Sequence, residues 1–194
     1  METGLWIIKK VTGAISASQL KSFVRDELIK IIESLGDVNF ESAVECLRNA
    51  KRSRTPSREV AMAITHLQSA YKIFNLAAEK ESKRWLPNAD REISCRKKAF
   101  LSLLFIVICY AYLKEKSLIK TYSQQLSESW LDYLHEARRH YFYTGNAYDN
   151  HKRAVELNQM DKNLIEFCKK IGGTSWHHRP EDIGIPSHPS TNMA

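Results

Sequence analysis

The sequence predicts an all-α protein, a single-domain bundle of about six helices. Apolar residues recur at spacings of three and four along most of the chain, which is the pattern of helices that bury one face. Helix breakers are few, because the 194 residues include only seven Gly and five Pro, and three of the Pro follow residue 179. No stretch of useful length alternates between apolar and polar residues as a half-buried strand would.

The first helix is expected over residues 18–35, where the apolar positions form one face and Gly36 follows as a C-terminal stop. A short second helix is expected to start near Asn39, a residue that caps helix N-termini well. It ends in the polar run 49–54. Residues 1–16 precede both helices and are interpreted as an N-terminal arm.

Thr55 and Pro56 mark the start of a third, long helix, because a capping residue is followed by Pro at the first helical position. The stripe of apolar residues fades around Trp85, and Pro87 breaks the chain. A fourth helix is expected from about residue 88 to residue 113.

Ser117 is expected to cap a fifth helix that reaches about Tyr143. A sixth helix is expected from Tyr148 to Ile171, and Gly172-Gly173 ends it. The bundle domain is therefore assigned to residues 17–173, and residues 174–194 form an extended tail that contains Pro and His. Short turns between successive helices predict antiparallel helical-hairpin packing.

Fifteen uncharged residues, 99–113, stand between basic flanks in the fourth helix. Such a run is either a membrane-contacting helix or the central helix of a bundle, buried on all sides. Fifteen residues of helix span about 22 Å, against a hydrocarbon core of about 30 Å. We therefore expect the central helix, with all sides buried by protein, including Leu103, Phe105, Ile106 and Ile108. An exposed side would mark a partner surface.

The formal net charge is +7, which allows either a polyanionic partner or a Lys-rich solvated surface. The four cysteines are widely spaced and include no CxxC pair, so neither a disulfide framework nor a zinc motif is predicted. The first residues do not have the pattern of a secretory signal. These observations favour a reducing, cytoplasmic location.

Basic and aromatic residues alternate around the turn between the last two helices. This combination suits RNA, because cations contact phosphates and aromatic rings stack on unpaired bases. The alternative is a helix end where cations offset the dipole and tyrosines seal the core. The candidate nucleic-acid-binding residues are Arg138, Arg139, His140, Tyr141, Tyr143, Lys152 and Arg153.

The N-terminal arm is a second candidate contact site, for a membrane surface or a partner, through Leu5, Trp6, Lys9 and Lys10. The alternative is an arm that packs back on the bundle. His177, His178 and His188 lie near two carboxylates in the tail, but their spacing matches no known metal site, so no metal is predicted.

The sequence contains no Gly-rich phosphate loop, HExxH helix or Ser-His-Asp order. It also lacks an Arg that is followed four to six residues later on the same helix by a His, the pair that is typical of small all-α nucleases of the HEPN type. The leading hypothesis is a non-catalytic adaptor or scaffold without a cofactor that binds a protein partner. The alternatives are an RNA-associated protein that uses the turn 138–153, or a peripheral membrane protein anchored by residues 4–15.

Overall fold

The computed structural model describes residues 38–83, 89–144, 147–174 and 176, and for 141–144 and 147–151 it describes the backbone alone. This part of the chain is helical and contains no strand, so the all-α class is confirmed. The helix expected over residues 18–35 lies outside the described residues, as does the arm 1–16. The described helices are α3 (Val38–Arg52), α4 (Pro56–Ser82), α5 (Ala89–Leu113), α6 (Lys116–Thr144) and α7 (Ala147–Lys170).

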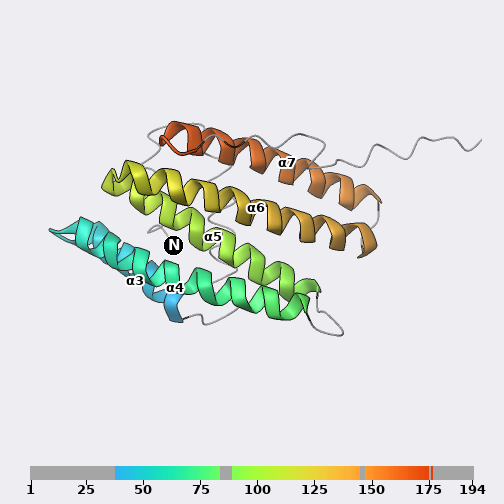
Figure 1. The fold of residues 1–194 in the computed structure, drawn as a ribbon, viewed down its shortest axis with the longest axis horizontal. Helices are drawn as coiled ribbons and strands as arrows, with labels where there is room; N and C mark the ends of the chain where they lie inside the picture. Colours follow the sequence, from blue (N-terminus) through green and yellow to red (C-terminus); the bar gives the residue numbers. More distant parts are fainter. Residues whose placement is uncertain (1–37, 84–88, 145–146, 175, 177–194) are drawn as a thin grey trace, which may run out of the picture.

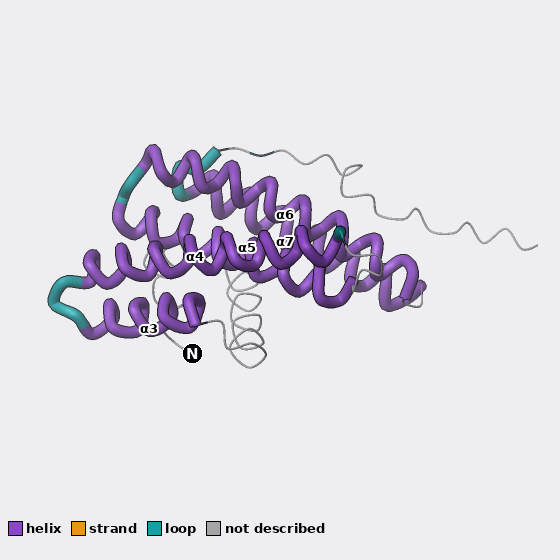
Figure 2. Tube along the Cα trace, turned by 60° about the horizontal axis from the view of Figure 1, so that its bottom comes forward, coloured by secondary structure: helices purple, strands orange, loops and turns teal. Residues whose placement is uncertain are grey.

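Each described helix runs roughly opposite to the one before it, and α7 lies at the far side from α3 (Figure 1). A short loop joins α3 to α4 at one end of the molecule (Figure 2). The expected antiparallel helical-hairpin packing is only partly correct. The packing continues from α4 through α5 to α6, whereas α6 and α7 contact each other less extensively.

The reason for this continuous packing is the composition of α5. Every residue from Lys98 to Cys109 is buried, whichever side of the helix it occupies. Leu103, Ile106 and Ile108 have no exposed surface and Phe105 is 2 % exposed, so the prediction of a central helix is confirmed. Among the described helices, none is both long enough and apolar enough to cross a membrane.

Aromatic contacts connect α5 to its neighbours on two sides. The ring of Phe40 in α3 meets that of Phe105 edge-on, with centroids 6.3 Å apart. Phe100 packs against Trp130 of α6 at a centroid distance of 4.9 Å. Pairs with these geometries add to the stability that burial alone provides. The core therefore extends from α3 through α5 to α6 without a break.

The helix starts are close to those expected, but the expected caps are not formed. Pro56 does occupy the first position of α4, yet the Thr55 side chain makes no cap hydrogen bond. Its hydroxyl lies 3.3 Å from the Ser53 hydroxyl instead, so the two side chains satisfy each other. Asn39 and Ser117 each lie in the first turn of their helices rather than before it.

The turn from α5 to α6 contains a feature that no sequence signal indicates. Lys114 has a φ of +63°, in the left-handed region where glycine is favoured. The backbone N–H of Glu115 donates to the carbonyl of Tyr110 at 3.0 Å, as in a Schellman motif. The hydrogen bonds of this tight turn hold a lysine in a conformation that costs it free energy.

The expected stop after α7 is present. Gly172 has a φ of +78°. The N–H of Gly173 donates to the carbonyl of Cys168 at 2.8 Å, which closes the helix end. The N–H of Thr174 then donates to the Ser123 hydroxyl at 2.8 Å. These bonds join the end of α7 to the first half of α6.

A buried polar contact also joins α6 to α7. The indole N–H of Trp130 donates to a carboxyl oxygen of Asp161 at 2.8 Å. Trp130 has no exposed surface and Asp161 is 2 % exposed. A buried carboxyl group requires hydrogen-bond partners, because water cannot reach it. This bond therefore fixes the position of α7 along α6.

Candidate interaction surfaces

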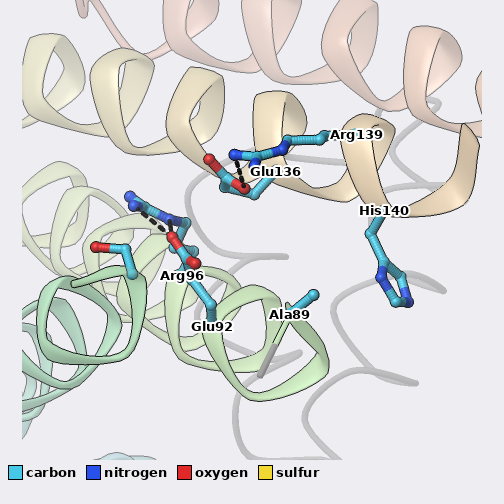
Figure 3. Close-up of a pocket in the computed structure, with 7 residues that line it drawn as sticks. Ala89, Glu92, Arg96, Glu136, Arg139 and His140 are labelled. Carbon is cyan, nitrogen blue, oxygen red and sulfur yellow. Dashed lines mark hydrogen bonds and ion pairs between the residues drawn. The ribbon is translucent and has the colours of Figure 1, made fainter. Parts of the chain in front are cut away.

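The ends of α5 and α6 enclose a cleft of about 390 Å³. We call it the α5–α6 cleft; its lining residues are Ser82, Ala89, Glu92, Arg96, Glu136, Arg139 and His140. Figure 3 shows Arg139 and His140 approaching from α6, and Glu92 and Arg96 rising from α5. Two of the seven residues predicted to bind nucleic acid therefore lie in one cleft.

The charged groups of α5 in this cleft are held by opposite charges. Arg96 donates from Nε and Nη2 to one carboxylate oxygen of Glu92, at 3.0 and 2.8 Å. The Arg96 side chain is 17 % exposed and that of Glu92 is 8 % exposed, so both are largely desolvated. Nη1 of Arg96 also lies 3.8 Å from a carboxylate oxygen of Asp132, across the gap to α6.

The charged groups of α6 are held in the same way. Nε2 of His140 lies 2.9 Å from a carboxylate oxygen of Asp90, in the first turn of α5. Nη1 of Arg139 lies 3.9 Å from a carboxylate oxygen of Glu136, and Nδ1 of His135 lies 3.5 Å from the other oxygen of that carboxylate. Carboxylates thus stand beside the basic side chains of the cleft, and the contacts of Arg96 and His140 join α5 to α6.

The other residues predicted to bind nucleic acid are not gathered in this cleft. Arg138 is half-buried, and burial lowers the pKa of its guanidinium from the ordinary value. Lys152 and Arg153 are exposed on α7. Tyr141 and Tyr143 belong to α6, but their side chains lie outside the described part. Leu5, Trp6, Lys9 and Lys10 of the arm also lie outside the described residues, as do the tail histidines.

The described residues contain neither a reactive thiol nor a group of metal ligands. All four cysteines are free and buried. Burial raises the pKa of the Cys168 thiol to about 12, and burial also raises the pKa of Cys109. A protonated, buried thiol is a poor nucleophile and a poor metal ligand. Within the part of the chain that the structure describes, no three His, Cys, Asp or Glu side chains group as metal ligands.

A second surface runs along the outer side of α4. We call it the outer stripe; its residues are Arg58, Met62, Thr65, Ser69, Ile73, Leu76 and Lys80. Met62, Ile73 and Leu76 are 44 %, 48 % and 52 % exposed, although they are large and apolar. Spacings of three and four place all seven on one side of the helix, away from the buried side that includes Ile64, Leu67 and Phe74.

The hydroxyl groups of the two polar residues in the middle of the stripe donate hydrogen bonds to backbone carbonyls of α4. Ser69 Oγ donates to the carbonyl of Thr65 at 3.2 Å, and Thr65 Oγ1 donates to the carbonyl of Ala61 at 3.4 Å. A partner surface that covers the stripe therefore leaves neither hydroxyl without a hydrogen-bond acceptor. The stripe is apolar at three positions and locally satisfied at two more, which makes it suitable for contact with another protein surface.

The chain matches no family model, curated protein or solved structure. The function is therefore inferred from the surfaces of the molecule.

Sequence reasoning singled out Arg139 and His140 but missed their neighbours in the cleft, although the spacing of Glu92 and Arg96 is typical of an ion pair on one helix turn. It also missed the outer stripe, which the repetition of Met, Ile and Leu on the polar side of α4 could have indicated.

Proposed function

We propose that this protein is a non-catalytic interaction protein and that it binds a protein partner through the outer stripe of α4. The observation that carries the proposal is the exposure of Met62, Ile73 and Leu76 on one side of a well-packed helix. Single exposed apolar residues are ordinary, but Ile73 and Leu76 are neighbours on one helix face and Met62 lies on the same line, and such a grouping of large apolar residues is typical of a binding surface.

The α5–α6 cleft supports the non-catalytic part of this proposal. Its arginines and His140 lie beside carboxylates of the same cleft or its rim, which is the pattern of ion pairs that hold two helices together. The four buried thiols agree with a protein that works in a reducing compartment, and we assign it to the cytoplasm on that ground.

The test is a capture experiment followed by binding with purified components. The tagged full chain is compared with the double variant Ile73→Glu/Leu76→Glu and with Val155→Glu as the matched control. Val155 is 50 % exposed on α7, so it offers the same type of change on another helix. A protein captured by the wild type is then purified, and its Kd for each variant is measured.

We expect the partner to bind the wild type and Val155→Glu equally, and the stripe variant at least about ten-fold more weakly, because two carboxylates would replace apolar contacts and would lose their water in the interface. Unchanged circular dichroism and Tm would show that both variants are folded. Equal affinity of the partner for all three proteins would overturn the proposal.

RNA binding around residues 138–153 is a second candidate, favoured by the exposure of Arg139, Lys152 and Arg153. It requires that Arg138→Glu/Arg139→Glu abolish salt-sensitive retention on RNA or heparin. Retention that is unchanged in this variant would exclude it. The membrane alternative through residues 4–15 requires sedimentation with anionic vesicles that depends on Trp6.

A further inference from the structure

Exposed cations outnumber exposed carboxylates around the outer stripe. Arg58 and Lys80 stand at its two ends and Lys72 stands beside it, and all three are exposed. No carboxylate belongs to the stripe itself. The three cations would therefore surround any segment that covers Met62, Ile73 and Leu76.

Of the carboxylates of α4, Glu79 is exposed one turn beyond Leu76, whereas Glu59 is half-buried. Burial and then Glu59 and Glu45 raise the pKa of Cys46, so Glu59 lies near α3. Glu81 is buried. Three exposed cations, Arg58, Lys72 and Lys80, against the one exposed carboxylate of α4 give the stripe and its edges a net positive formal charge.

The geometry of the stripe fits a helix. An interval of eleven residues, which matches three helical turns, separates Met62 from Ile73, Thr65 from Leu76 and Ser69 from Lys80. The stripe therefore runs almost straight along the helix. From Arg58 to Lys80 it extends about 33 Å at 1.5 Å per residue. A partner helix of about 22 residues would cover it.

A lipid surface fits less well. Helices that lie on membranes present a broad apolar face. Here the apolar side chains form a narrow row that Thr65 and Ser69 interrupt. Such a row corresponds to the seam between two packed helices. The small Ser69 and Thr65 side chains, with their hydroxyls already bonded, would let a second helix approach closely.

We propose that the partner segment is an amphipathic helix whose apolar row is flanked by acidic residues, and that it lies along α4 from Arg58 to Lys80. This proposal rests on the proposed function, which requires only that the stripe bind a protein. Apolar contacts with Met62, Ile73 and Leu76 would supply affinity, and the cations would select acidic flanks and increase the association rate.

Two labelled synthetic peptides of about 22 residues test this inference. Both carry the same Leu row, and one has Glu and the other Lys at the flanking positions. Their binding to the full chain is measured by fluorescence anisotropy. We expect the acidic peptide to bind at least about ten-fold more tightly than the basic one at low salt, and the difference to shrink as salt screens the charges.

Charge-reversal variants provide the matched comparison. Lys72→Glu/Lys80→Glu is expected to reverse the preference between the two peptides. Lys152→Glu/Lys162→Glu changes the net charge equally on exposed positions of α7 and is expected to leave the preference intact. Equal sensitivity of binding to both charge-reversal variants would show a long-range charge effect, and the assignment to α4 would be overturned.

Three further outcomes would overturn the inference, and each can be distinguished from failure of the proposed function. If both peptides bind equally and Ile73→Glu/Leu76→Glu abolishes both, the stripe binds protein without selecting acidic flanks. If neither peptide binds, the stripe does not accept a helix, and the capture experiment still decides whether it binds a protein. Binding to phosphatidylserine vesicles that depends on Ile73, without peptide binding, would assign the stripe to a membrane.

Discussion

The hydrogen bond between Trp130 and Asp161 offers the sharpest test of how α7 is held. Trp130→Phe keeps an aromatic ring in the core but removes the indole N–H that donates to the Asp161 carboxyl oxygen. Loss of a partner from a buried acceptor costs about 1–3 kcal/mol. The smaller ring loses about 1 kcal/mol of apolar burial beside Phe100 and Tyr133. The expected loss is therefore about 2–4 kcal/mol.

For a domain of this size, that loss lowers Tm by roughly 4–16 °C. Urea denaturation followed by far-UV circular dichroism measures the free energy of unfolding without relying on the Trp signal. Because α7 has less extensive contacts than the other described helices, its amide protons should lose protection from hydrogen exchange more than those of α4 or α5.

A double-mutant cycle with Asp161→Leu separates the hydrogen bond from the change in ring size. Replacement of both partners by apolar groups should cost less than the sum of the single changes, by about 1–2 kcal/mol. Additive effects would refute the reasoning, because the bond would then contribute nothing to the position of α7. If the amide protons of α5 lost as much exchange protection as those of α7, the expectation of an effect confined to α7 would be refuted.

Three further changes have expected outcomes. Gly173→Ala would place a Cβ 2.9 Å from Ser123 Oγ and 3.0 Å from the Cys168 carbonyl oxygen, so urea denaturation should show a loss of about 1–3 kcal/mol; unchanged stability would contradict this packing. Lys114→Gly should relieve the left-handed backbone and raise Tm by about 1–4 °C, whereas a lower Tm would show that the lysine side chain contributes more than the strain. Burial, followed by Tyr122, raises the pKa of Tyr110 from 10.0 to about 12, so its stabilising contribution is complete below pH 10 and is lost as pH rises through about 12. Alkaline absorbance titration should show a late phenolate step that Tyr110→Phe removes, and persistence of that step would assign it to another tyrosine.

The main helix boundaries could be predicted from local signals. Pro56 fits the first position of a helix because its missing N–H is not needed there. The uniform apolar character of residues 99–113 predicted a helix buried on every side, because charged flanks and short length exclude most other environments. Gly172 and Gly173 marked the end of α7 through the backbone conformation that the turn requires.

Other features depend on neighbours that local signals do not specify. The contacts of Arg96 with Asp132 and of His140 with Asp90 require that the first turns of α5 face the last turns of α6, which only the packed bundle determines. The turn at Lys114 lacks the glycine that would have indicated it. Thr55 could not be recognised as an unused cap, because the competing Ser53 hydroxyl lies outside the helix. The outer stripe was missed because the apolar residues on the buried side of α4 are more numerous and regular than those on its exposed side.

The burial of every residue from Lys98 to Cys109 in α5 has a consequence for synthesis of the chain. As the polypeptide leaves the ribosome, α3 and α4 emerge before α5 and can cover one side of it. The side that packs against α6 stays exposed until the 29 residues of α6 have also emerged. During that interval Phe100 lacks its Trp130 neighbour, and an apolar surface faces water or a chaperone. A released chain that is truncated near residue 113 should therefore aggregate or remain bound to a chaperone, whereas one truncated after residue 144 should not.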